Sequence, residues 1–199
     1  MTVVHLARHG QSSWHEWNRY AGHTDVPLTA AGREQAEAFG RWAVTRPIVL
    51  VASSDLRRSL DTAAPAARLL GVDVVVDWRL REVDFGDAEG LTPTEIEAAW
   101  PERWESFLAR PATAPLPGAE PGPSAVDRYR AALFALSDRA ASADGELLVI
   151  AHRTALRLWL CQSLGVPLDD YRRSFPWFDN TQVISGRLEE DGDFILISS

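Results

Sequence analysis

The sequence contains no lysine, so all 20 of its basic residues are arginine. This absence excludes Schiff-base chemistry, a pyridoxal phosphate anchored on lysine, and the phosphate-binding lysine of a P-loop. A single cysteine, Cys161, excludes an internal disulfide and a cysteine-ligated metal site. No apolar run approaches the ~20 residues of a membrane helix, and the N-terminus lacks the layout of a signal peptide. We therefore expect a cytoplasmic protein with no membrane partner.

The composition is that of an ordinary globular protein, with 46% hydrophobic and 24% charged residues in 199. That length predicts one domain, residues 1–199, and is compatible with a homodimer. The net charge of -8 argues against a nucleic-acid partner, which needs a basic surface. A small anion would instead bind in a local arginine pocket, because the planar guanidinium fork matches phosphate.

Apolar strands alternate with helical segments along most of the chain. This pattern predicts an α/β fold with a mostly parallel central sheet and helices on both faces. The expected strands are 2–7, 47–53, 72–76 and 147–151, and the expected helices are 29–46, 56–70 and 124–143. Residues 93–110 predict one or two short cover helices, and the proline-rich stretch 111–123 predicts an irregular loop. A hairpin is expected at the end, from 181–188 and 194–198.

Candidate functional residues follow the strands. Ligands of parallel α/β sheets bind beyond the carboxyl ends of the strands, so these residues should face one crevice. The residues in question are Arg8, His9 and Ser12 after the first strand, Arg58 after the second, Glu82 after the third, and His152 and Arg153 after the fourth. Histidines, arginines and a carboxylate at one place predict a phosphate site with a nucleophile and an acid.

These side chains can break a phosphate ester together. A neutral His9 imidazole can attack phosphorus if arginine forks neutralise the phosphoryl oxygens. His152, if protonated, would add charge and donors, and Glu82 would protonate the leaving alkoxide. Gly10 would let the backbone pass close to the phosphate. This chemistry requires no metal and no other cofactor.

Several residues have competing interpretations. Arg57 competes with Arg58 for the phosphate, and Asp84 and Glu89 compete with Glu82 for the role of the acid. Arg172-Arg173 is either a second anion clamp or a solvated pair. The remaining histidines and three tryptophans are more typical of loop, core or cover structure, although the tryptophans could line a cleft: His5, His23, Trp14, Trp104 and Trp177.

Five segments resemble the motifs of one family, in order along the chain. They are L-A-R-H-G-Q-S at 6–12, T-D-V-P-L-T-A-A-G-R-E-Q-A at 24–36, S-D-L-R-R-S-L-D-T-A at 54–63, L-R-E-V-D-F-G-D-A-E-G at 80–90 and V-I-A-H-R-T-A-L-R at 149–157. Together they resemble the histidine phosphatase superfamily, also called phosphoglycerate-mutase-like, in its phosphatase branch. The resemblance extends from Val3 to about Asn180.

The resemblance implies a role for each matching residue. His9 would be the phosphorylated nucleophile flanked by Arg8, and Arg58 and His152 would complete the phosphate pocket. Glu82 would be the proton donor. The family fold is an α/β sandwich with a small cap, here at about 91–127. The implied activity is a phosphomonoesterase acting on a small phosphorylated metabolite through a phosphohistidine.

The sequence departs from the family pattern at three places. Trp14 is followed by His15 where the family has asparagine, so a pH-dependent side chain would help Ser12 hold phosphate. His152 is followed by Arg153 instead of glycine, which could recruit another anionic group of the substrate or obstruct the pocket. The lid segment is represented only by residues 117–121.

These departures keep two alternatives open. One is a phosphoglycerate-type mutase, although those enzymes carry a longer mid-chain insertion. The other is a protein that binds a phosphorylated ligand without hydrolysing it, or that catalyses a non-hydrolytic reaction.

Overall fold

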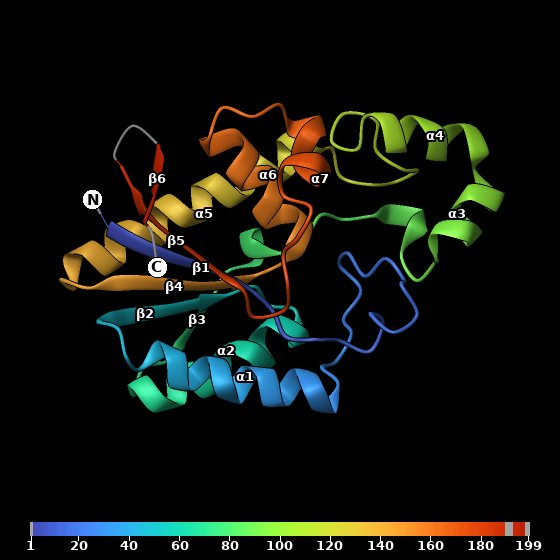
Figure 1. The fold of residues 1–199 in the computed structure, drawn as a ribbon. Helices are drawn as coiled ribbons and strands as arrows, with labels where there is room; N and C mark the ends of the chain where they lie inside the picture. Colours follow the sequence, from blue (N-terminus) through green and yellow to red (C-terminus); the bar gives the residue numbers. More distant parts are fainter. Residues whose placement is uncertain (1, 190–192, 198–199) are drawn as a thin grey trace.

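The fold is built on a six-stranded sheet, which we describe from a computed structural model covering residues 2–189 and 193–197 (Figure 1). The strands are β1 (Thr2–Arg8), β2 (Ile48–Ser53), β3 (Val74–Val76), β4 (Glu146–Ala151), β5 (Val183–Leu188) and β6 (Phe194–Leu196). Their order is β3-β2-β4-β1-β5-β6. Strands β1 to β4 run parallel to one another, whereas β5 pairs in an antiparallel manner with both of its neighbours, β1 and β6. The predicted mostly parallel sheet is confirmed.

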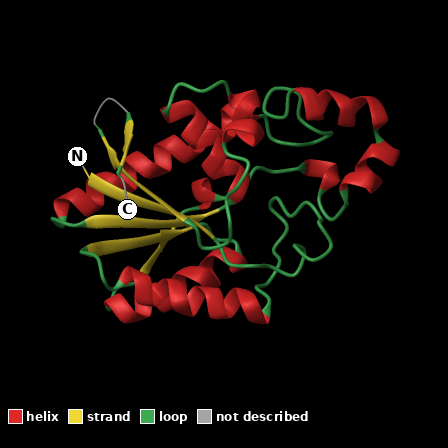
Figure 2. Ribbon diagram, in the orientation of Figure 1, coloured by secondary structure: helices red, strands yellow, loops and turns green. Residues whose placement is uncertain are grey.

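Helices cover both faces of this sheet, as predicted (Figure 2). On one face lie α1 (Ala30–Ala43) and α2 (Arg57–Leu70), and on the other lie α5 (Gly122–Ser142) and α6 (Arg153–Ser163). The shorter helices are α3 (Pro93–Ala99), α4 (Pro101–Ala109), α7 (Tyr171–Ser174), η1 (Trp78–Leu80), η2 (Gly86–Ala88) and η3 (Leu168–Asp170). None of the helices among the described residues is long and apolar enough to cross a membrane.

The ends of the elements follow local chemistry. The Thr29 side chain accepts a hydrogen bond from the Gly32 backbone N–H at 3.0 Å and caps α1, as expected. Gly71 ends α2 in the left-handed region at φ 72°, which glycine adopts without strain.

Other boundaries differ from the prediction. Helix α1 ends at Ala43, before the predicted residue 46, and α5 begins two residues earlier than predicted, at Gly122. Cys161 lies buried inside α6. Strands β5 and β6 form the predicted hairpin, and its tip at 190–192 lies outside the described residues.

Residues 91–127 pack around an apolar cluster that they share with Leu158 and Cys161 of α6 and Tyr171 of α7. Ile96, Trp104 and Phe107 are buried there against Val83 and Phe85. Glu120, in the stretch that replaces the family's lid motif, is held by Arg128 at 2.7 Å. Helices α3 and α4 extend beyond the sheet, on the side toward which β1, β2 and β4 run (Figure 1).

The strand register brings three chain segments to one point. Arg8 at the end of β1 is paired with Ala151 at the end of β4. Ser53 at the end of β2 is paired with Ile150 of the same strand. The residues that follow these strands therefore emerge side by side at the carboxyl edge of the sheet.

Leu148 in the central strand β4 is fully buried, so its replacement by alanine should leave a cavity. We expect L148A to lower the free energy of unfolding by about 2–5 kcal/mol. Urea unfolding followed by circular dichroism measures this change. L69A is the matched control, because Leu69 is 47% exposed on α2. An equal loss in both variants would contradict the assignment of Leu148 to the core.

Candidate active site

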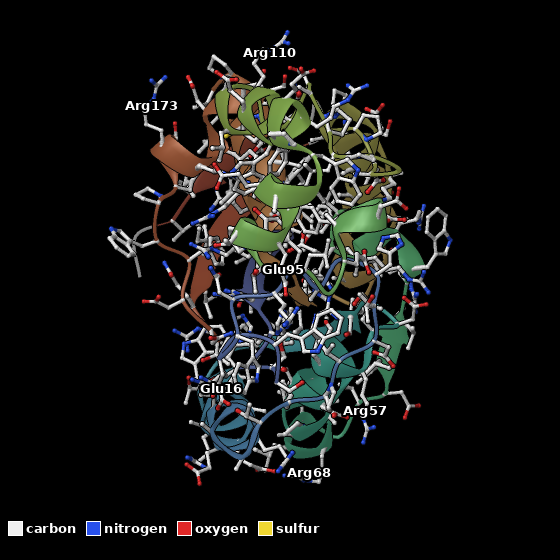
Figure 3. The ribbon with its side chains drawn as sticks, turned by 90° about the vertical axis from the view of Figure 1, so that its right-hand side faces the viewer. Glu16, Arg57, Arg68, Glu95, Arg110 and Arg173 are labelled. Carbon is white, nitrogen blue, oxygen red and sulfur yellow. The ribbon has the colours of Figure 1, made fainter. Side chains whose placement is uncertain are left out.

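A cleft of about 390 Å³ lies beyond the carboxyl ends of β1, β2 and β4. Figure 3 views the molecule from this side. Seven of the eight predicted site residues line the cleft, namely Arg8, His9, Ser12, His15, Arg58, Glu82 and Arg153. The eighth, His152, is fully buried, with its ring centroid 5.1 Å from that of His9. The structure thus brings all eight residues together.

His9 is held in the tautomer that a nucleophile needs. Its Nδ1 lies 2.7 Å from the Gly10 carbonyl oxygen, which can only accept, so Nδ1 carries the proton. The lone pair is then on Nε2. Burial, followed by the positive charges of Arg58 and Arg8, holds the pKa of His9 well below its usual value. The imidazole is therefore neutral and nucleophilic at neutral pH.

The backbone around His9 is fixed from three sides. Its N–H donates to Ala151 at 3.0 Å, its carbonyl accepts from Asn180 Nδ2 at 2.9 Å, and Gly10 N donates to Thr62 Oγ1 at 3.0 Å. A Cβ on Gly10 would lie 2.6 Å from the Gly32 carbonyl oxygen. The close approach to the start of α1 therefore requires glycine at this position.

His152 is neutral in this structure, so it can supply hydrogen-bond donors to a ligand but not positive charge. Burial first, then Arg58 and His9, hold its pKa well below the usual value. Its Nε2 lies 2.7 Å from Ser54 Oγ, and Nδ1 has no hydrogen-bond partner among the described residues. If the Ser54 hydroxyl donates to Nε2, Nδ1 carries the proton and is a free donor beside His9.

Arg8 and Arg58 are buried cations held by backbone carbonyls. Arg8 donates to Phe178 O at 2.7 Å, and Arg58 donates to Gly22 O at 2.7 Å and Thr24 O at 2.9 Å. Burial lowers the pKa of both guanidinium groups to about 10, and they remain charged at neutral pH. Neither makes an ion pair among the described residues, so both charges are available to an anion.

Glu82 sits at the start of α6. Its Oε1 accepts from the backbone N–H groups of Ala155 at 2.8 Å and Val83 at 2.9 Å, and its Oε2 accepts from Thr154 N at 3.0 Å. A helix N-terminus favours negative charge, so these bonds fix the carboxylate in the wall of the cleft. Oε2 accepts one backbone hydrogen bond where Oε1 accepts two, so the remaining acceptor position of the carboxyl group is on Oε2.

His15 lies between Ser12 and Arg8. Its Nε2 accepts from the Arg8 guanidinium, and its Nδ1 lies 3.1 Å from Ser12 Oγ. Burial, followed by the charge of Arg8, lowers the pKa of His15 to about 4. Its charge therefore does not vary near neutral pH, contrary to the expectation from sequence.

The structure separates most of the competing residues. Arg57 is exposed and pairs with Asp61 at 3.6 Å, whereas Arg58 is 1% exposed in the cleft. Glu89 accepts from the backbone N–H groups of His23 and Thr24, both at 2.6 Å, and so organises a loop.

Other candidates are placed by their surroundings. His5 contacts Glu146 at 2.7 Å on the sheet, and His23 lies 3.6 Å from Asp84. Trp14 lines the cleft, Trp104 lies in the core, and Trp177 is 79% exposed.

Arg172 lines the cleft, whereas Arg173 is exposed and points outward (Figure 3).

Sequence reasoning missed several residues of the site. Arg157 lines the cleft, Ser54 contacts His152, and Asn180 holds the His9 backbone. Arg157 could have been found, because it lies four residues after Arg153 on the same face of one helix. Ser54 and Asn180 carried no periodic signal.

Among residues 2–189 and 193–197, no group of three or more histidine, cysteine or acidic side chains is arranged to hold a metal.

Comparison with known proteins assigns the family. The model of the histidine phosphatase superfamily (branch 1) matches residues 4–197. A glucosyl-3-phosphoglycerate phosphatase from Mycolicibacterium vanbaalenii is 33% identical over 83% of this chain and 76% of its own length. A Salmonella typhi protein named "Probable phosphoglycerate mutase GpmB" is 34% identical over 87% and 80%.

Solved structures give the same result. A mycobacterial glucosyl-3-phosphoglycerate phosphatase complexed with VO3 superposes with a TM-score of 0.87 and 28% identity, covering 99% of this chain and 98% of that one. YhfR from Bacillus stearothermophilus gives 0.89 and 28%, covering 98% and 95%. The chain belongs to the histidine phosphatase superfamily, as its motifs implied. It is a phosphoric monoester hydrolase of that superfamily.

The depressed pKa of His15 predicts a pH-dependent stability. Between its folded pKa of about 4 and an unfolded pKa of ~6.5, His15 is charged in the unfolded chain and neutral in the folded protein. Unfolding in this pH range therefore takes up one proton at this side chain. His15 therefore contributes to a loss of stability as the pH falls from 6.5 toward 4. We expect H15N to reduce the number of protons linked to unfolding in this window by about one. Urea unfolding at several pH values measures it, and parallel curves for the two proteins would refute the assignment.

Proposed function

We propose that this protein is a phosphomonoesterase that cleaves a small phosphorylated metabolite through a phosphohistidine on His9. One observation carries the proposal. The Gly10 carbonyl leaves the His9 lone pair on Nε2, in a cleft whose walls hold the unpaired Arg8 and Arg58 guanidinium groups. A neutral nucleophile beside two buried cations suits attack on a dianionic phosphoryl group.

In the first step, the phosphoryl oxygens are neutralised by Arg8 and Arg58 and accept a hydrogen bond from His152 Nδ1. Ser12 and His15 border the same oxygens and keep Arg8 in place. His9 Nε2 forms a bond to phosphorus as the ester P–O bond breaks. Glu82, protonated for this step, gives its proton from Oε2 to the leaving alkoxide, which departs as the alcohol.

In the second step, water attacks phosphohistidine on the face that the alcohol has left. Glu82, now a carboxylate, takes a proton from this water as the P–N bond breaks. The electron pair of that bond returns to Nε2, and inorganic phosphate leaves. His9 is again neutral and Glu82 is again protonated, so the cycle balances without a metal or another cofactor.

The proposal also covers the organisation of the chain. Residues 1–199 act as one domain, in which residues 91–127 form a cap and determine which alcohol part fits. The apolar cluster around Trp104 and Phe107 supports this role, because it packs the segment against Leu158 and Tyr171 of the helices that border the cleft. The protein works in the cytoplasm, as a monomer or homodimer. The net charge of -8 supports a small metabolite rather than a nucleic acid as its partner.

A phosphoglycerate-type mutase is the second candidate, favoured by the 34% identity to the Salmonella typhi protein. A mutase keeps the phosphoryl group on histidine until a second hydroxyl takes it, so water must be excluded. Products formed from 3-phosphoglycerate distinguish the two. A phosphatase releases inorganic phosphate and glycerate, whereas a mutase yields 2-phosphoglycerate without net phosphate release.

Replacement of the nucleophile should abolish turnover. We expect H9A to release phosphate from p-nitrophenyl phosphate at least about 10³-fold more slowly than the wild type, because no other side chain on the cleft takes its place. Released phosphate is measured with a chelator present, and circular dichroism checks that the variant is folded. H5A is a control, since His5 lies on the sheet. Wild-type rates in H9A would overturn the proposal.

Loss of the acid should depend on the leaving group. E82Q keeps the size of the side chain but cannot give a proton, so kcat for an alkyl phosphate should fall about 10²–10⁴-fold. The fall for p-nitrophenyl phosphate should be much smaller, because p-nitrophenolate leaves without protonation. Steady-state kinetics on both substrates test this difference. An equal loss on both would assign Glu82 to binding instead of proton transfer.

A further inference from the structure

The cleft holds more positive charge than one phosphate group requires. Six arginines line it, against Glu82 as the one carboxylate in the lining, and only Arg19 among the six is paired, with Glu95 at 2.9 Å. The five arginines without an ion pair carry five positive charges, and Glu82 carries one negative charge, so the lining has an excess of four positive charges. A phosphomonoester dianion offsets two of them.

The excess is concentrated on α6 and α7, away from the nucleophile's own strand. Arg153 and Arg157 lie four residues apart on α6, and Arg172 lies on α7. Arg153 donates to the Pro176 carbonyl oxygen at 3.2 Å, and Arg157 donates to the same oxygen at 2.5 Å. Two guanidinium groups therefore converge on one neutral acceptor. Like charges at this spacing on a helix destabilise it.

One donor of each arginine in this pair, the Nε–H group, is unsatisfied. The Nε atoms of Arg153 and Arg157 are buried without a hydrogen-bond partner in the part of the chain that the structure describes, and Arg157 is only 5% exposed. No carboxylate of the described residues forms an ion pair with either one. By contrast, the exposed Arg173 pairs with Asp170 at 2.6 Å and Arg68 pairs with Glu37 at 2.9 Å. Buried, unpaired donors of this kind are costly unless a ligand completes them.

Arg172 borders the pair in a fixed position. Its guanidinium lies 4.6 Å from the centre of the Phe107 ring, and its Nε donates to the Tyr171 hydroxyl at 3.1 Å. It adds a third charge to the same side of the cleft and is also unpaired with any carboxylate of the described residues. Repulsion among these groups is felt on the phosphate side as well, because Arg153 helps to lower the pKa of Arg8.

We infer that Arg153 and Arg157, with Arg172 beside them, form a subsite for a second anionic group on the alcohol part of the substrate. This inference rests on the proposed function, since it specifies which phosphomonoesters the cleft prefers. The group is a carboxylate or a second phosphate, either of which accepts two parallel hydrogen bonds from a guanidinium edge. It lies within a few bonds of the ester, because Arg153 directly follows His152 and lines the same cleft as His9.

Matched substrates test the subsite. 3-Phosphoglycerate and glycerol 3-phosphate differ in a carboxylate against a hydroxymethyl group, and fructose 1,6-bisphosphate and fructose 6-phosphate differ in a second phosphate. We expect the wild type to show a kcat/KM at least about tenfold higher for the more anionic member of one pair. The pair that shows the preference identifies the group.

The variant R153Q assigns the preference to the subsite. It should reduce the ratio of kcat/KM within the preferred pair about tenfold or more, whatever its effect on the less anionic member. R173Q is the matched control, because Arg173 lies on α7 outside the cleft and should leave the ratio unchanged. If the wild type shows no preference in either pair, or R153Q leaves the ratio intact, the subsite is refuted. His9-dependent phosphate release would then still support the proposed function.

Binding provides a readout that does not need turnover. Calorimetric titration of the H9A protein with 3-phosphoglycerate and glycerol 3-phosphate, and with the two fructose phosphates, should show the same preference. The double variant H9A/R153Q should lose it. If no substrate is hydrolysed but this preference holds, the phosphatase proposal fails and the subsite stands. Equal affinities within both pairs would overturn the subsite on their own.

Discussion

The arrangement of the site depends on one constraint: guanidinium groups are buried at the carboxyl ends of parallel strands, and no carboxylate in the described part of the chain forms an ion pair with them. Arg8 and Arg58 are held by carbonyl oxygens of Phe178, Gly22 and Thr24. Carbonyls orient a guanidinium but leave its full charge in place. Burial first, and then the charge of Arg58, holds the pKa of His9 and of His152 well below the usual value, so both remain neutral.

Helix α6 connects the parts of the cleft. Its first backbone N–H groups hold Glu82, the residue before it is His152, and its arginines Arg153 and Arg157 line the cleft. The helix is anchored by the apolar side chains of Leu156 and Trp159, which are buried in the main core. A single well-packed element thus fixes the acid, the second histidine and two cations relative to one another.

Much of this could be predicted from the sequence, and the limits have physical causes. The strands were evident because buried parallel strands are continuous apolar runs, and the R-H-G and H-R turns mark the ends of β1 and β4. Thr29 and Gly71 marked helix ends because their capping chemistry is local. The protonation states of His15 and His152 were not predictable, since burial and the positions of Arg8 and Arg58 decide them. Asn180 was missed because it reaches the His9 backbone across 171 positions of sequence.

The electrostatics of the unliganded cleft also explain how a phosphoryl dianion would change it. After burial, Arg58 is the group that lowers the pKa of His152 most, and an incoming phosphate would offset its charge, so binding would remove part of that effect. A donor on His152 Nδ1 then faces negative charge instead of guanidinium groups. The same binding relieves repulsion between Arg8 and Arg153. A bound phosphoryl dianion would therefore relieve repulsion among these arginines, and this relief would favour anions over neutral molecules of the same shape.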